Sequence, residues 1–288
     1  MDPVSKAFAI VFLVATMLSI GLKVTVADLM SVVRNRGRMA RLLAVNFLLI
    51  PAIGLLLATL IPMSMDAKVG FLLVAVAPGG LNAIQFTSKT TEGLPYAATI
   101  LFILSFLSVV VSPLMAAAVI PMETSLVLPY GKAIAYLLLG VIGPMLAGMA
   151  VHHFWGRMAH TLAKPVALVG TVSFVVVVVL LWGLRKQAKA TLTTSELAAM
   201  LIFIVAAMVV GWVLGGPGKE MRRVLATGSS MRNAALGLMI AINSFPDTRV
   251  DEAVIAFGAL MIPMNMVFTV YSVIQARRDR RRSGADGR

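Results

Sequence analysis

Arg232 is the residue of this chain whose type and position carry the most chemistry. It is the one formal charge in the apolar stretch 224–244, which reads VLATGSSMRNAALGLMIAINS. At about 1.5 Å per residue it lies ~13 Å along a helix from Arg223, near the middle of a hydrocarbon core of about 30 Å. A guanidinium at that depth is costly unless it meets a polar cavity or a partner, so it indicates a functional site.

Three interpretations of Arg232 are open. The side chain lies at the membrane surface, it pairs with backbone carbonyls for a structural purpose, or it binds an anion. No acidic residue is expected at similar depth, because the acidic side chains fall in loops or at span ends. We therefore favour a mobile anion as its partner, held also by neighbouring polar side chains of the same stretch, which are Ser229, Ser230 and Asn233.

A second apolar stretch is interrupted by residues that break helices. Residues 77–93 read APGGLNAIQFTSKTTEG, with a proline and two glycines followed by polar side chains. Broken helix at membrane depth must be buried in protein or line a cavity, although close glycine packing between helices is an alternative. The expected break residues are Pro78, Gly79 and Gly80 here and Gly228 in the other stretch. Asn82 and Gln85 are candidate binding residues.

The composition places these two stretches in a polytopic helical membrane protein. Of 288 residues, 59% are hydrophobic and only 13% are charged, against about 25% charged in soluble domains. The net charge of +13 does not indicate nucleic-acid binding, since the cations lie between apolar segments. With no cysteine, no HExxH motif and no buried acidic pair, we expect neither an enzyme nor a metal site, and no cofactor.

The apolar stretches predict nine membrane spans, near residues 4–26, 42–62, 69–87, 94–120, 131–151, 165–184, 197–214, 224–244 and 253–273. Most of the Lys and Arg residues fall on one side if the amino terminus lies outside, which places the basic tail 276–288 in the cytoplasm and the protein in the plasma (inner) membrane. The broken segments are the third and eighth spans and run in opposite directions, which is typical of an inverted-repeat transporter.

At these residues the chain resembles the bile acid:sodium symporter family. That family carries a PGG motif followed by polar residues, and here the motif is in residues 77–93. Residues 226–241, ATGSSMRNAALGLMIA, are similar to the family's Gly-Met-Gln-Asn-Ser-Gly-Leu segment. Residues 45–51, VNFLLIP, share a polar residue five before a proline. The resemblance extends over essentially the whole chain.

The resemblance implies a fold of two inverted repeats arranged as a panel domain and a core domain. Residues 1–120 would form a shortened first repeat and 121–275 the second, with the third and eighth spans crossing at their broken midpoints. It also implies secondary active transport of an organic anion, of the bile acid, keto acid or pantoate class, in many members together with sodium.

The chain departs from this family where sodium would bind. The family's carboxylate falls on Gly228 and its glutamine on Arg232, while a Ser-Asn pair falls on Ala83 and Ile84, so we expect degraded sodium sites. Polar family positions fall at or near Asn46, Ser105, Asn233 and Asn265.

Our hypothesis is that the Arg232 guanidinium occupies the place of a sodium ion and attracts the substrate anion. The alternatives are a sodium-coupled symporter of the same fold, an arsenite-permease-like carrier, and a channel. The expected partners are the lipid bilayer and the substrate, and the sequence predicts no particular oligomeric state.

Overall fold

The computed structural model consists of helices and their connections. It describes residues 3–78, 93–120, 135, 137–185, 192–216, 218–245 and 248–285, and no strand occurs among them. The amino-terminal half contains α1 (Pro3–Gly21), α2 (Val26–Arg34), α3 (Arg36–Ala44), the π-helix η1 (Val45–Leu49), α4 (Ile50–Leu60), α5 (Met65–Ala75) and α7 (Gly93–Val119). The remainder contains the π-helix η2 (Leu138–Ile142), α9 (Gly143–Phe154), α10 (Gly156–Arg185), α11 (Thr194–Leu214), α12 (Lys219–Ser230), α13 (Ala234–Ser244) and α14 (Val250–Ala285). The prediction of an all-helical protein is confirmed for the described residues.

Six of the helical segments are long and apolar enough to cross a membrane, namely Pro3–Gly21, Arg36–Leu60, Ala97–Val119, Gly156–Leu180, Thr194–Leu214 and Val250–Ser272. They coincide with six of the nine expected spans. The fifth expected span, residues 131–151, overlaps the shorter apolar stretch Leu138–Phe154. The third expected span extends beyond α5 into residues 79–92, which lie outside the described part, and the eighth is divided between α12 and α13.

Each π-helix is followed by one residue and then by a proline. In η1 the Ile50 N–H bonds to the Val45 carbonyl, and in η2 the Gly143 N–H bonds to the Leu138 carbonyl, each reaching five residues back. Pro51 and Pro144 follow. A proline has no N–H and its ring crowds the carbonyl four residues earlier, so a wider turn relieves the clash and lets the helix continue.

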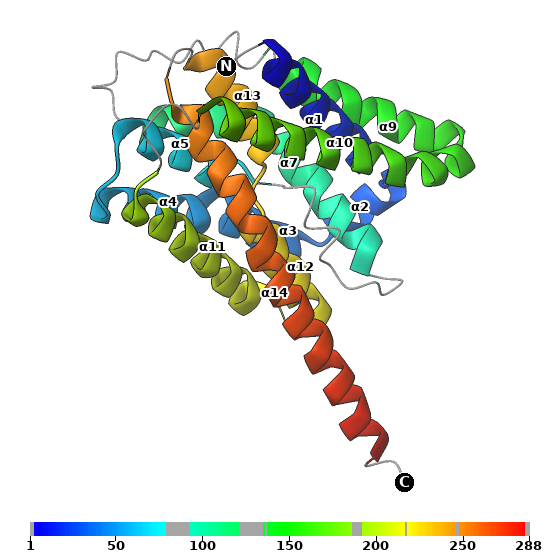
Figure 1. The fold of residues 1–288 in the computed structure, drawn as a ribbon. Coiled ribbons are helices and arrows are strands. Elements are labelled where there is room, and N and C mark those ends of the chain that lie inside the picture. Colours follow the sequence, from blue (N-terminus) through cyan, green and yellow to red (C-terminus); the bar gives the residue numbers. More distant parts are fainter. Residues whose placement is uncertain are drawn as a thin grey trace.

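The helices pack in two groups (Figure 1). In one group α1 packs most extensively against α10 and α9. Glycine permits the α1–α9 approach, because a Cβ added to Gly148 would lie 2.5 Å from the Leu18 carbonyl oxygen. The other group joins α4, α5, α11, α12, α13 and α14. The carboxyl-terminal part of α14 projects away from both groups.

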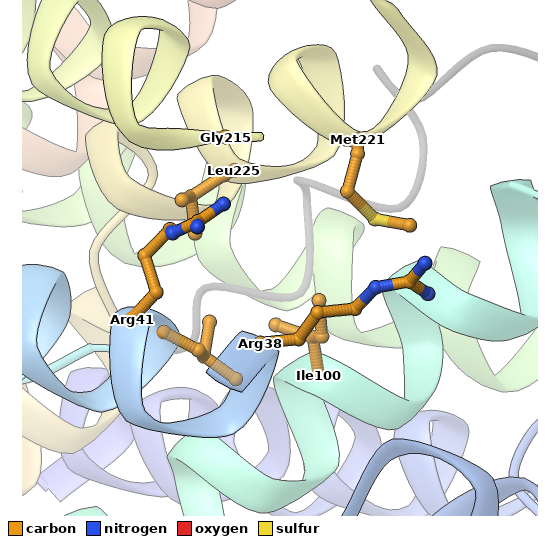
Figure 2. A pocket seen from close by; sticks show the side chains of 7 residues that line it. Arg38, Arg41, Ile100, Gly215, Met221 and Leu225 are labelled. Carbon is orange, nitrogen blue, oxygen red and sulfur yellow. The ribbon is translucent and has the colours of Figure 1, made fainter. Parts of the chain in front are cut away.

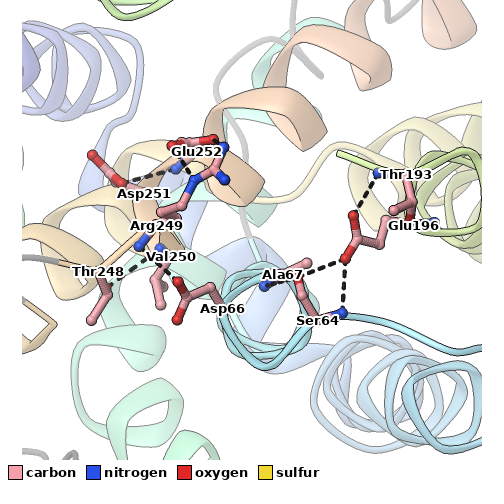
Figure 3. Close-up of polar contacts among 10 residues, drawn as sticks. All are labelled: Ser64, Asp66, Ala67, Thr193, Glu196, Thr248, Arg249, Val250, Asp251 and Glu252. Atoms are coloured by element: carbon pink, nitrogen blue, oxygen red, sulfur yellow. Dashed lines mark hydrogen bonds and ion pairs between the residues drawn. The ribbon is translucent and has the colours of Figure 1, made fainter. Parts of the chain in front are cut away.

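Carboxylates tie helix starts together at one end of the second group (Figure 3). Glu196 accepts hydrogen bonds from the Ser64 N–H at 2.8 Å and the Ser64 hydroxyl at 2.7 Å, and its other oxygen accepts from the Thr193 N–H at 2.7 Å. It therefore links the start of α11 to the start of α5. Asp66 accepts from the Arg249 N–H at 3.0 Å, which links α5 to the start of α14.

Glu196→Gln is expected to destabilise the fold by roughly 2 kcal/mol, because hydrogen bonds to a charged acceptor are about twice as strong as neutral ones. The measurement is the melting temperature of the purified protein in detergent. Glu252→Gln is the matched control, since Glu252 forms an ion pair with the Arg249 side chain, which is 40% exposed. Such a pair contributes about 1 kcal/mol or less. Equal melting temperatures for the two variants would contradict the assignment of Glu196 as a link between helices.

Candidate functional site

The eighth expected span is broken at residues 231–233. α12 ends at Ser230, and Met231 adopts an extended conformation with φ −88° and ψ 93°. α13 begins at Ala234, where the Asn233 side-chain oxygen accepts from the Leu236 N–H at 3.0 Å and caps the helix. Asparagine is among the strongest helix amino-terminal caps. The break predicted at Gly228 is therefore wrong in position, because Gly228 lies inside α12 and the chain leaves the helix three residues later.

The third expected span stops being helical three residues before Pro78, the first of the predicted break residues. α5 ends at Ala75, and Val76 to Pro78 follow without helix. The Ala77 carbonyl accepts from the Asn233 N–H at 2.7 Å, so the main chains of the two broken segments are in direct contact. The Ser112 hydroxyl of α7 donates to the Val76 carbonyl at 2.7 Å. Gly79, Gly80, Asn82 and Gln85 lie outside the described residues.

Arg232 extends from the break in the eighth span to the end of α5. Its side chain is fully buried, with 0% exposed. Nε donates to the Val74 carbonyl at 3.3 Å, and Nη2 donates to the Ala75 carbonyl at 2.6 Å. The last carbonyls of a helix lack intrahelical donors and carry the negative end of the helix dipole. Part of the charge of Arg232 is therefore stabilised by the carboxyl end of α5.

Asn46 supplies the other oxygens around the guanidinium. Arg232 Nη1 donates to Asn46 Oδ1 at 3.2 Å, and Nη2 also approaches the Asn46 carbonyl oxygen at 3.4 Å. That carbonyl is available because the Ile50 N–H bonds to Val45 and the next residue, Pro51, has no N–H. The π-turn and the proline together therefore present an unused backbone oxygen to the arginine.

The hydrogen-bond acceptors of Arg232 are neutral. Among the described residues, the groups that accept from it are backbone carbonyls and the Asn46 amide oxygen, with no carboxylate. Burying a charge without an opposite charge is costly, and several oriented dipoles are needed to offset it. A buried monovalent cation is commonly surrounded by oxygens of this kind. The arrangement thus gives the break a permanent positive charge.

Two buried polar groups flank Arg232 without a hydrogen-bond partner among the described residues. They are the Ser229 hydroxyl at the end of α12 and the Asn233 Nδ2 group at the start of α13. Beside Ser229, no described atom lies within 4 Å of where a Cβ on Gly228 would be. Buried polar groups are usually satisfied, and exceptions are commonly explained by water or a ligand. Within the described part of the chain, one amide donor and one hydroxyl at this break thus have no hydrogen-bond partner.

Three further predicted site residues, Ser105, Ser230 and Asn265, are buried, and two of them bond to each other. The Ser230 hydroxyl donates to Asn265 Oδ1 at 2.7 Å, which connects α12 to α14. Ser105 is buried in α7, where its carbonyl accepts from the Ser108 hydroxyl at 2.7 Å. The structure thus joins Arg232 to Asn46 and Ser230 to Asn265.

Sequence reasoning missed several contributors. The Val74, Ala75 and Ala77 carbonyls have no residue-type signal, because every residue has a backbone oxygen. Ser112 does have a signal in the sequence, because it is a polar residue that precedes Pro113 within an apolar helix.

Arg38 and Arg41 are not among the residues that the sequence predicted for the site. Both line a small cavity together with Leu42, Ile100, Gly215, Met221 and Leu225 (Figure 2). Its volume is about 20 Å³. Leu42 lies one turn before Asn46, and its carbonyl accepts from Asn46 Nδ2 at 3.1 Å. The cavity is therefore close to the residues that contact Arg232.

Comparison with known proteins gives two matches. A family model described as the sodium bile acid symporter family matches residues 10–187, which include Asn46 and the third span and end before Arg232. The chain is also 22% identical over 238 residues to the probable sodium/metabolite cotransporter BASS2, chloroplastic, of Oryza sativa subsp. japonica. That match covers 80% of this chain and 55% of the rice protein, so the chain spans about half the length of that relative.

Proposed function

Because this chain belongs to the sodium bile acid symporter family, an integral membrane family of transporters, we propose that it carries a small organic anion by alternating access, with Arg232 in place of a bound sodium ion. One observation carries the proposal. The guanidinium is buried against neutral oxygens at the contact between two broken helices.

The oxygens around Arg232 support the replacement of a cation. Hard cations such as sodium are bound by carbonyl and amide oxygens, and in transporters with broken helices the carboxyl-terminal ends of half-helices supply them. Here the donors reach the carbonyls of Val74 and Ala75 and the amide of Asn46. A tethered guanidinium provides the charge at all times, so the substrate does not need a mobile cation at this position.

The anion is expected to bind where the break still has hydrogen-bonding capacity. The Ser229 hydroxyl and Asn233 Nδ2 are buried and have no partner among the described residues. The amino terminus of α13 adds partial positive charge, which suits a carboxylate. In this proposal Arg232 supplies a positive electrostatic potential, and Ser229 and Asn233 contact the substrate. The remaining candidates, Asn82, Gln85, Ser105 and Asn265, extend the same site.

The two helix groups are the parts that would move relative to each other. We assign the group of α1, α9 and α10 to the panel and the group of α4, α5, α11, α12, α13 and α14 to the core. The proposed protein has nine spans in two inverted repeats. Its amino terminus lies outside, and it resides in the inner membrane. The cavity beside Arg38 and Arg41, at about 20 Å³, has room for about one water, so this conformation is closed to an organic anion there.

Uptake into proteoliposomes tests the function. Radiolabelled pantoate, pyruvate and taurocholate would be offered in turn, with the outer salt as sodium chloride, potassium chloride or choline chloride. We expect saturable uptake of at least one anion at equal rates in the three salts. Uptake that strictly requires sodium would support the sodium-coupled alternative and reject the role of Arg232, while flux that does not saturate would indicate a channel.

A further inference from the structure

A groove between α11, α12 and α14 lies apart from the broken helices. Its volume is about 450 Å³, and its walls include Val209, Trp212, Phe268 and Tyr271. Trp212 packs against Phe268 edge to face, with ring centroids 6.0 Å apart. Val209 and Tyr271 are 55% and 59% exposed, so the groove is open at the surface. Apolar walls of this size can accept a flexible hydrocarbon chain.

The groove also carries positive charge at one end. Lys219 and Arg223 line it and are four residues apart, which places them on the same face of α12. Arg223 Nη2 donates to the Ser272 carbonyl at 2.8 Å, so the guanidinium is held against α14. The groove therefore combines an apolar wall with two cations.

The position of the groove matches the level of lipid headgroups. Trp212 lies near the end of the apolar segment Thr194–Leu214, and Tyr271 lies near the end of Val250–Ser272. Tryptophan and tyrosine are enriched at the interface between hydrocarbon and water, and Lys and Arg near that interface attract anionic lipids. Lys219 follows the end of the apolar segment Thr194–Leu214, while Val209 lies within that segment.

We propose that this groove binds an anionic phospholipid, with the phosphate at Lys219 and Arg223 and an acyl chain along Val209, Trp212 and Phe268. The ligand is a lipid and not a free phosphate, because most of the lining is apolar and faces the side of the helix bundle. The site is separate from the transport site, although α12 contributes to both.

Quenching of Trp212 by a brominated lipid tests this directly. The full-length protein with Trp155→Phe and Trp182→Phe retains Trp212 as its sole tryptophan. It would be placed in phosphatidylcholine vesicles containing increasing fractions of phosphatidylglycerol with brominated acyl chains, or of brominated phosphatidylcholine. We expect brominated phosphatidylglycerol to quench Trp212 at a mole fraction at least about five-fold lower than brominated phosphatidylcholine.

Two variants and one matched control distinguish binding of phosphatidylglycerol in the groove from general contact between the protein and lipid. Lys219→Gln should reduce the preference for phosphatidylglycerol about five-fold, as expected for one cation near the surface. Val209→Phe should weaken the preference by narrowing the groove at its apolar wall while leaving its charge unchanged. Arg157→Gln removes an exposed cation on α10, outside the groove, and should leave the preference as it is.

Three results would overturn the proposal. Equal quenching by the two lipids would mean that Trp212 contacts only bulk lipid. An equal loss of preference in Arg157→Gln and Lys219→Gln would assign the effect to the overall charge of the protein. Relief of quenching by soluble glycerol 1-phosphate, which has no acyl chain, would identify a site for free phosphates.

Discussion

Arg232→Gln is expected to weaken anion binding about 100-fold. A unit charge about 6 Å from a carboxylate contributes roughly 3 kcal/mol at an effective dielectric constant of about 20, and each 1.4 kcal/mol is a factor of about ten. The same change removes the hydrogen bonds that Arg232 donates to the carbonyls of Val74, Ala75 and Asn46, of which, in the described part of the chain, only Val74 keeps another donor, the Ala77 N–H. This loss should destabilise the fold by about 3 kcal/mol. Binding would be measured by titrating the transported anion against the purified protein with calorimetry.

The loss of stability needs its own controls. Arg232→Lys keeps the charge with fewer donors, so it should retain most of the affinity while still lowering the melting temperature. Arg222→Gln is the matched change on α12, the half-helix that precedes the break, where the Arg222 side chain donates to the Gly216 carbonyl at 2.8 Å. It should leave affinity unchanged. If Arg232→Gln is folded and binds the anion as the original protein does, Arg232 has no part in binding.

The double substitution Gly228→Glu with Arg232→Gln is expected to make the protein respond to sodium. It removes the fixed charge and restores a carboxylate four residues before a glutamine, as the family resemblance implies for a sodium site. Outside its own helix, no described atom lies within 4 Å of a Cβ placed on Gly228, so a side chain can begin there without a clash among the described residues. Sodium at about 100 times its dissociation constant would stabilise the fold by about 2.7 kcal/mol, which raises the melting temperature by roughly 5–10 °C.

The measurement compares melting temperatures in sodium chloride and choline chloride. The original protein should give the same value in both salts. Gly228→Glu alone should also be insensitive to sodium, because the new carboxylate would pair with Arg232. Arg232→Gln alone lacks the carboxylate and should respond weakly. A sodium response already present in the original protein would mean that Arg232 does not replace the cation.

Much of the fold was predictable because membrane spans are encoded locally. Six expected spans coincide with long apolar helices, since each stretch of apolar residues long enough to cross the hydrocarbon core stands out on its own. The eighth expected span was less accurate, because it is divided between two helices. The fifth overlaps the helical stretch Leu138–Phe154, and most of residues 121–136 lie outside the described part of the chain.

The break in the eighth span shows why local reasoning failed there. Glycine is the usual residue at a helix interruption, so Gly228 was the natural choice. The chain instead breaks where Asn233 caps the next helix and its N–H reaches the Ala77 carbonyl. A capping asparagine is visible in the sequence, and the contact with Ala77 is not.

The sequence by itself determined that this chain is helical and membrane-spanning, that a lone arginine lies within its eighth apolar stretch, and that a second stretch is broken near Pro78. Those properties depend on residue type and on distance along the chain. Only the tertiary structure decided what surrounds Arg232. Its partners are backbone oxygens of Val74 and Ala75 and both oxygens of Asn46, far away in sequence. Backbone carbonyls are the same in every residue, so folding alone determines which of them are left without a donor and lie next to the charge.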